Sequence, residues 1–192
     1  MNFNIKATMA TIGPGRIIFV NFDQEKPSVC FAFPKSDAET LENIRKAIEA
    51  ARLEGEAKFG GNFNPPANKI ALKDGDVEKA DDPKFAGMYY LNCSSKFMPG
   101  VVGVNMLPGL EKLEPLTPEA IYPGVNARLS VNFFPYNFNG NKGISAGLNL
   151  IQVLGGGERL GRIITAEEAF GGGFSAIPAD MTSNDDYNSI FN

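Results

Sequence analysis

The sequence predicts a mainly β fold with one packed helix. Thirteen prolines and twenty-one glycines among 192 residues indicate many turns. Runs rich in β-branched and aromatic residues recur along the chain, whereas only one segment has a clear helical period. With 43% apolar and 21% charged residues, a chain of this length can bury a core as one domain.

A hairpin followed by a helix is predicted in the first third of the chain. The runs RIIFVNFD and SVCFAFP, separated by an EKP turn, have strand character. In SDAETLENIRKAIEAARLEG, Ser36 and Glu39 have capping-box spacing, apolar residues follow at helical intervals, and Gly55 supplies a stop. We therefore expect an amphipathic helix at about residues 37–54, packed on the sheet.

The remaining two thirds should contain loops and more strands. Residues 58–83 are rich in glycine, proline, asparagine and charge, which predicts a loop with one short strand at 70–72. Strands are expected in GMYYLNCSS and KFMPGVVGVN, and GLEKLEPLTPEAIYPG should be a proline-punctuated loop. A long hairpin follows, with strands in NARLSVNFFPY and ISAGLNLIQVL. We expect one domain over residues 1–177 and a flexible acidic tail over 178–192.

Composition excludes several classes of function. The chain has no histidine, which removes the commonest general base and most zinc sites. The two cysteines, Cys30 and Cys93, lack CxxC spacing and are expected to be buried thiols in a reducing compartment. No apolar run approaches a membrane span, and the first residues lack a signal-peptide pattern. We expect an intracellular, non-enzymatic protein without cofactor or metal.

Two motifs do not support a catalytic or metal site. LGGGERLG lacks the lysine and hydroxyl residue of a phosphate-binding loop, so a turn is favoured. KDGDVEKADD resembles half of a calcium loop but has no correctly spaced terminal glutamate, which favours a solvated acidic loop. A magnesium nuclease using Asp74 and Asp76 stays open as an alternative, although it requires carboxylates that converge.

The first strand of the long hairpin has two contrasting faces at the strand period of two. One face is apolar and should be core: Leu129, Val131 and Phe133. The other face mixes a cation, hydrogen-bonding groups and two rings: Arg128, Ser130, Asn132, Phe134 and Tyr136. Bases stacked on such rings gain roughly 1–3 kcal/mol each. Phe138 lies too close to the hairpin tip to assign.

Charge supports a local binding surface. Residues 87–110 and 120–157 contain no acid, and their cations are Lys96, Arg128 and Lys142. A second strand that could contribute to the binding surface, GMYYLNCSS, carries Tyr90 and is followed by Lys96. Aromatic residues in strands are usually core, however, so Phe134 packing under the helix and Tyr136 capping a barrel end remain the competing interpretation.

The C-terminal segment is a separate candidate site. It contains no lysine or arginine after Arg162 and ends in DDYNSIFN. Its carboxylates and apolar anchors are typical of a tail that binds a partner protein: Asp185, Asp186, Tyr187 and Phe191.

Four stretches of the chain match one family pattern in order between Phe31 and Arg162. They are FAFPKSDAETLENIRKAIEAA, KFGG with the later LKDGD, YYLNCSSKFMPGVV, and IYPGVNARLSVNFFPYNFNGNKGISAGLNLIQVL followed by GERLGR. The hairpin block, with YPG, Arg128 and GNKG, is the most specific. Together these stretches resemble the single-stranded DNA-binding proteins of tailed phages.

The resemblance implies an OB-fold-like five-stranded barrel with long loop elaborations and an acidic tail. It also implies single-stranded DNA binding without sequence preference, in replication, recombination and repair in the host cytoplasm, and partner recruitment through the tail. Polymerase, helicase or primase are the implied partners, some members imply a homodimer, and no membrane is involved. The residues expected to contact DNA are Arg128, Lys142, Lys96, Tyr136, Phe134, Tyr90 and Lys35. The alternative is a phage structural or decoration protein whose exposed rings form subunit contacts.

Overall fold

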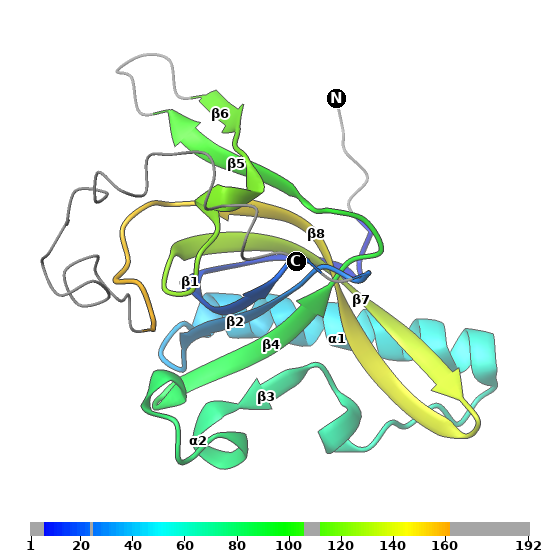
Figure 1. Cartoon of the computed structure of the whole chain (residues 1–192). Helices are drawn as coiled ribbons and strands as arrows, with labels where there is room; N and C mark the ends of the chain where they lie inside the picture. The colour runs from blue at the N-terminus through cyan, green and yellow to red at the C-terminus, as the bar shows by residue number, and fades with distance from the viewer. Residues whose placement is uncertain (1–5, 24, 106–111, 162–192) are drawn as a thin grey trace, which may run out of the picture. The chain divides into compact units, whose positions relative to one another are not determined.

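Within the described residues 6–23, 25–105 and 112–161, the computed structural model has one sheet of eight strands that curls onto itself (Figure 1). The strand order is β3-β4-β2-β1-β7-β8-β5-β6, and β4 also pairs with β8. This extra pairing closes a barrel of five strands: β1 (Met9–Asn21), β2 (Ser28–Pro34), β4 (Met88–Ser94), β7 (Asn126–Phe138) and β8 (Asn141–Val153). The predicted β fold with one main helix is confirmed.

The other elements elaborate the barrel. They are α1 (Ala38–Phe59), η1 (Ala67–Lys69), β3 (Leu72–Asp74), α2 (Gly75–Glu78), η2 (Pro83–Phe85), β5 (Gly100–Asn105), β6 (Lys112–Pro115) and η3 (Pro118–Ala120). Two expectations were wrong in detail. The short strand of the 58–83 segment begins two residues later than expected, and β6 lies where the sequence predicted loop. None of the helices in the described part is long and apolar enough to cross a membrane.

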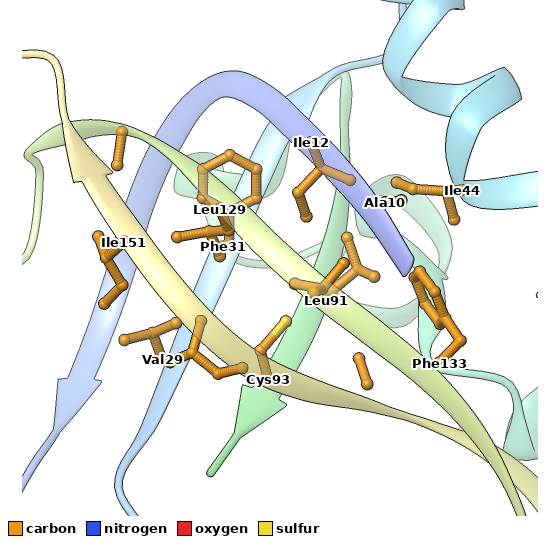
Figure 2. Packing of buried hydrophobic residues seen from close by; sticks show 14 of the residues in the cluster. Ala10, Ile12, Val29, Phe31, Ile44, Leu91, Cys93, Leu129, Phe133 and Ile151 are labelled. Atoms are coloured by element: carbon orange, nitrogen blue, oxygen red, sulfur yellow. The ribbon is translucent and has the colours of Figure 1, made fainter. Parts of the chain in front are cut away.

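The barrel interior is filled by side chains from all five strands (Figure 2). Leu129, Val131 and Phe133 of β7 are fully buried there, which confirms the predicted core face of this strand. Ile44 of α1 joins the same cluster from the helix side (Figure 2). The helix therefore closes the core by supplying apolar side chains at helical spacing.

The ends of α1 differ from the prediction. The N-cap is Asp37 rather than Ser36, and its carboxylate accepts a 3.0 Å hydrogen bond from the backbone N–H of Thr40. At the other end the helix continues through Gly55 to Phe59. Gly55 is buried against Phe63, and a Cβ at this position would lie 2.4 Å from the Phe63 ring. Close packing, not helix termination, thus explains this glycine.

A second apolar cluster lies outside the barrel interior. It is formed by Ile18, Cys30, Ala32, Phe85 and Tyr90. Its strand residues alternate with residues of the main core, and Phe85 of η2 covers them. Cys30 and Cys93 are free and buried, as predicted, and burial raises the pKa of the Cys30 thiol to about 11.

The barrel closes through a short parallel seam between β4 and β8. Only two residue pairs form it, Cys93 with Ala146 and Ser94 with Gly147. Nearer the start of β8, an isolated parallel bridge joins Ile70 to Ile144. The segment before β3 therefore fills the gap where β4 and β8 diverge, and it supports the part of the β7–β8 hairpin that extends past the barrel (Figure 1).

Candidate nucleic-acid interface

The outward face of β7 carries the mixed side chains expected from the sequence. Arg128 and Phe134 are exposed, whereas Ser130, Asn132 and Tyr136 are half-buried. Phe134 is 40% exposed and belongs to neither apolar cluster, so it does not pack under α1. The competing interpretation of Phe134 as core is therefore wrong.

A cleft of about 670 Å³ lies next to Phe134. Its lining comes from the β1–β2 turn, the end of β4, and the outward residues of β7 and β8, so it lies over the β4–β8 seam. The lining residues are Glu25, Lys26, Ser94, Ser95, Lys96, Asn132, Phe134, Gly147, Leu148 and Asn149.

The cleft combines an aromatic ring with cations and neutral hydrogen-bonding groups. Lys26 and Lys96 are exposed, and Glu25 is the single acid among the lining residues of this cleft. Neither lysine forms an ion pair with a described residue. Both ammonium groups can therefore meet an anion without first breaking a salt bridge.

Phe134 and Tyr136 each lie against a glycine of β8. The Phe134 ring is in van der Waals range of Gly147, where an added Cβ would be 3.5 Å from a ring carbon. Tyr136 lies closer to its cross-strand partner Gly143, since a Cβ there would be 2.2 Å from the Tyr136 Cζ and Oη atoms. The glycines thus give the two rings room to lie against the sheet.

Lys142 lies near the hairpin tip and not in the cleft. Its Nζ donates a 2.8 Å hydrogen bond to the backbone carbonyl oxygen of Asn62. Phe138, on the same tip, is 72% exposed. The structure therefore gives Lys142 a protein partner before any ligand is present.

Arg128 lies at a different hollow, of about 220 Å³, beside the start of α1. Asp37 and Glu39 line this hollow with it. Arg128 and Phe134 are six residues apart on one extended strand, which separates them by about 20 Å. The structure places these two residues on one face but does not bring them together.

Two residues that were expected to contact DNA lie in surroundings that do not suit this role. Tyr90 is only 5% exposed, and its ring meets Phe85 edge-on with centroids 4.9 Å apart, so neither face is open to a base. Lys35 donates to Asp74 at 2.5 Å and to Asp76 at 2.7 Å, and these hydrogen bonds raise its pKa. The surroundings of both residues therefore disfavour a contact with DNA.

The same ion pairs bear on the alternative of a metal-dependent nuclease. Asp74 and Asp76 face Lys35, and no group of three metal-ligating side chains occurs among the described residues.

The tail residues Asp185, Asp186, Tyr187 and Phe191 lie outside the described residues, as does the expected boundary near residue 177.

Sequence reasoning missed Lys26. Its EKP segment was interpreted as a turn only, because nothing local indicates that this turn borders the outward face of β7. The sequence carries no clear signal for this contact, since Glu25 directly before Lys26 balances its charge.

Comparison with known proteins identifies one family. The family described as Enterobacter phage Enc34, ssDNA-binding protein, matches residues 15–187. No curated protein matches the chain.

Three solved structures of the single-stranded DNA-binding protein from bacteriophage Enc34 are similar to the chain. The complex with ssDNA is 22% identical, with a TM-score of 0.67 over 81% of this chain and 91% of that chain. The C-terminal truncation is 22% identical, with a TM-score of 0.67 over 81% and 90% of the two chains. A third structure is 21% identical, with a TM-score of 0.65 over 86% and 91%. These similarities confirm the predicted OB-like barrel. Since the family match spans most of the sequence, the chain belongs to the Enc34 family of phage single-stranded DNA-binding proteins.

Proposed function

We propose that the chain binds single-stranded DNA without sequence preference in the cleft beside Phe134. The observation that carries this proposal is an exposed ring, Phe134, that lines the same cleft as two lysines with no ion-pair partner among the described residues. Family membership and the likeness to the Enc34 protein in complex with ssDNA support it.

Single strands are favoured because the faces of their bases are accessible. A base can stack on Phe134 only when it has left a duplex, while Lys26 and Lys96 meet phosphates of either form. Stacking does not depend on which base is present, since every base has a π face. The neutral groups of the cleft, such as Ser95 and Asn149, add hydrogen bonds without a fixed base pattern.

The remaining sequence candidates extend this site. Tyr136 lies one step along the face of β7 from Phe134 and offers a second ring toward the hairpin. Arg128 and Lys142 lie at the far ends of the face and would contact phosphates of a longer strand. We expect their contribution to be smaller than that of the cleft.

The cellular role follows from binding. We infer that the protein protects single strands and removes their secondary structure during phage DNA replication, recombination or repair, and that residues 178–192 recruit replication proteins. A homodimer is part of the same hypothesis. The alternative of a decoration protein predicts assembly without DNA and no shift of a labelled oligonucleotide.

A fluorescence titration tests DNA binding directly. We expect labelled oligo-dT to bind much more tightly than a duplex of equal length at the same salt concentration. Phe134→Ala should weaken oligo-dT binding by about five- to 150-fold, as expected for one lost stack, while circular dichroism stays unchanged. Phe138→Ala is the matched control, because Phe138 is also an exposed ring but lies on the hairpin tip. Equal affinity for single-stranded and duplex DNA would refute the proposal.

A further inference from the structure

The most exposed aromatic ring among the described residues is Phe97, in the connection between β4 and β5. Its side chain is 74% exposed, and Met98 beside it is 49% exposed. Scattered apolar residues on a surface are ordinary, so exposure alone assigns no role. The position of Phe97 relative to the cleft is what distinguishes it.

Lys96 links this ring to the cleft. The Lys96 side chain lines the cleft, and its ammonium nitrogen lies 5.5 Å from the centroid of the Phe97 ring. A cation over an aromatic face is attracted by the ring quadrupole. Phe97 is not itself a lining residue, so its ring lies next to the cleft, beside Lys96 and on the side that the end of β4 supplies.

The backbone around Phe97 is anchored. The Ser95 N–H donates a 2.8 Å hydrogen bond to the carbonyl oxygen of Pro27, in the turn that also carries Lys26. The Phe97 N–H donates to the Ser95 hydroxyl oxygen at 3.4 Å, and Pro99 is buried. A short connection fixed at both ends holds the backbone that carries Phe97 in place, which lowers the entropy cost of ordering this backbone on binding.

We propose that Phe97 is a second base-stacking ring of the cleft, with Lys96 holding the phosphate next to the stacked base. The proposal rests on the proposed binding of single-stranded DNA and adds a residue that the sequence did not single out. Residues 87–110 contain no acid, so an approaching phosphate backbone meets no like charge from this segment. One base on Phe134 and one on Phe97 would place the strand across the barrel seam.

The absence of tryptophan in the sequence makes a direct test possible. In Phe97→Trp, the single indole should be quenched by oligo-dT in step with binding measured on a labelled oligonucleotide. In Phe138→Trp, the emission should stay constant at saturation with an oligo-dT that is short enough to fill the cleft without reaching the hairpin tip. Phe97→Ala should weaken oligo-dT binding by about fivefold or more and leave the urea midpoint unchanged.

The outcomes separate the two proposals. If the unchanged chain binds oligo-dT and Phe134→Ala weakens it, but the indole emission of Phe97→Trp and the affinity of Phe97→Ala stay unaltered, Phe97 is not a stacking residue. If the unchanged chain does not bind oligo-dT, the proposed function itself fails. A change in sedimentation coefficient for Phe97→Ala, without a change in DNA affinity, would assign Phe97 to a subunit contact and overturn the inference.

Discussion

The ammonium group of Lys142 donates a 2.8 Å hydrogen bond to the backbone carbonyl oxygen of Asn62, eighty positions earlier in the chain. This bond ties the tip of the β7–β8 hairpin to the loop that follows α1. The family resemblance implies that Lys142 contacts a DNA phosphate, and the structure adds a hydrogen bond within the fold. The two roles make different predictions.

Replacing Lys142 with alanine should lower the free energy of unfolding by about 1 kcal/mol, because one hydrogen bond from a charged donor is lost. Urea denaturation measures this loss. Lys69→Ala is the control, since Lys69 is exposed on η1 near the same loop and its ammonium group has no partner among the described residues. If Lys142→Ala leaves stability unchanged and instead weakens oligo-dT binding severalfold, the phosphate role is the correct one.

Gly55→Ala should destabilise the protein by about 1–3 kcal/mol, although alanine is the better helix former by about 1 kcal/mol. The added methyl group would meet the Phe63 ring at 2.4 Å inside the packed core. Gly61→Ala serves as the comparison, because a Cβ at Gly61 meets nothing within 4 Å. A stabilised Gly55→Ala variant would mean that Phe63 moves aside without cost.

Tyr90→Ala should act on stability and not on the DNA contact itself. Removing a buried ring costs about 3–5 kcal/mol, and Tyr90 packs edge-on against Phe85 in the second cluster. Thermal unfolding should therefore show a large loss, while Tyr90→Phe should retain DNA affinity. A folded Tyr90→Ala chain of normal stability that has lost oligo-dT binding would restore Tyr90 as a stacking residue.

The salt dependence of the affinity for DNA should show whether the two lysines of the cleft contact phosphates. The slope of log affinity against log salt falls by about 0.7 for each phosphate contact removed from a single strand. Lys26→Ala and Lys96→Ala should each reduce the slope by about this amount. Lys46→Ala is the matched control, since Lys46 lies on α1 beside Glu42, 3.5 Å away, and does not line the cleft. Unchanged slopes in both cleft variants would exclude these lysines as phosphate contacts.

The Lys35 cluster should make part of the stability dependent on pH. The hydrogen bond from Lys35, together with one from the Gly87 N–H, lowers the pKa of Asp76. A carboxyl with a lowered folded pKa stabilises the fold above its unfolded pKa, and this contribution disappears as the pH falls through the folded value. Lys35→Met should therefore be less stable than the unchanged chain at neutral pH, with the difference shrinking in acid. A difference that stays constant across this range would exclude the linkage.

The structure of individual strands and of the helix was largely predictable, because their periods are local. Leu129 and Phe133 alternate with Arg128 and Phe134 in the sequence as they do in space. The cap of α1 was less predictable, since Ser36 and Asp37 are both good N-caps and differ by one position. Such a choice depends on the exact path of the chain into the helix.

The set of residues that form the site was less predictable, because contacts between segments far apart in the sequence determine it. Tyr90 has the outward register expected of a surface residue, but Phe85 of η2 covers it. Lys35 looked like a free cation because Asp74 and Asp76 lie about forty residues further along the chain. Lys26 and Lys96 come together in the cleft only because two connections far apart in the sequence meet there, with the Ser95 N–H bonded to the carbonyl oxygen of Pro27.

The seam between β4 and β8 couples DNA binding in the cleft to closure of the barrel. Two of the residues that line the cleft, Ser94 and Gly147, are themselves one of the two pairs that hold the seam. A strand of DNA lying there would bridge both sides of the least extensively paired junction of the barrel. Binding and barrel closure are then thermodynamically linked, so that each bound strand should slow amide hydrogen exchange at Ser94 and Gly147 more than in the middle of β7.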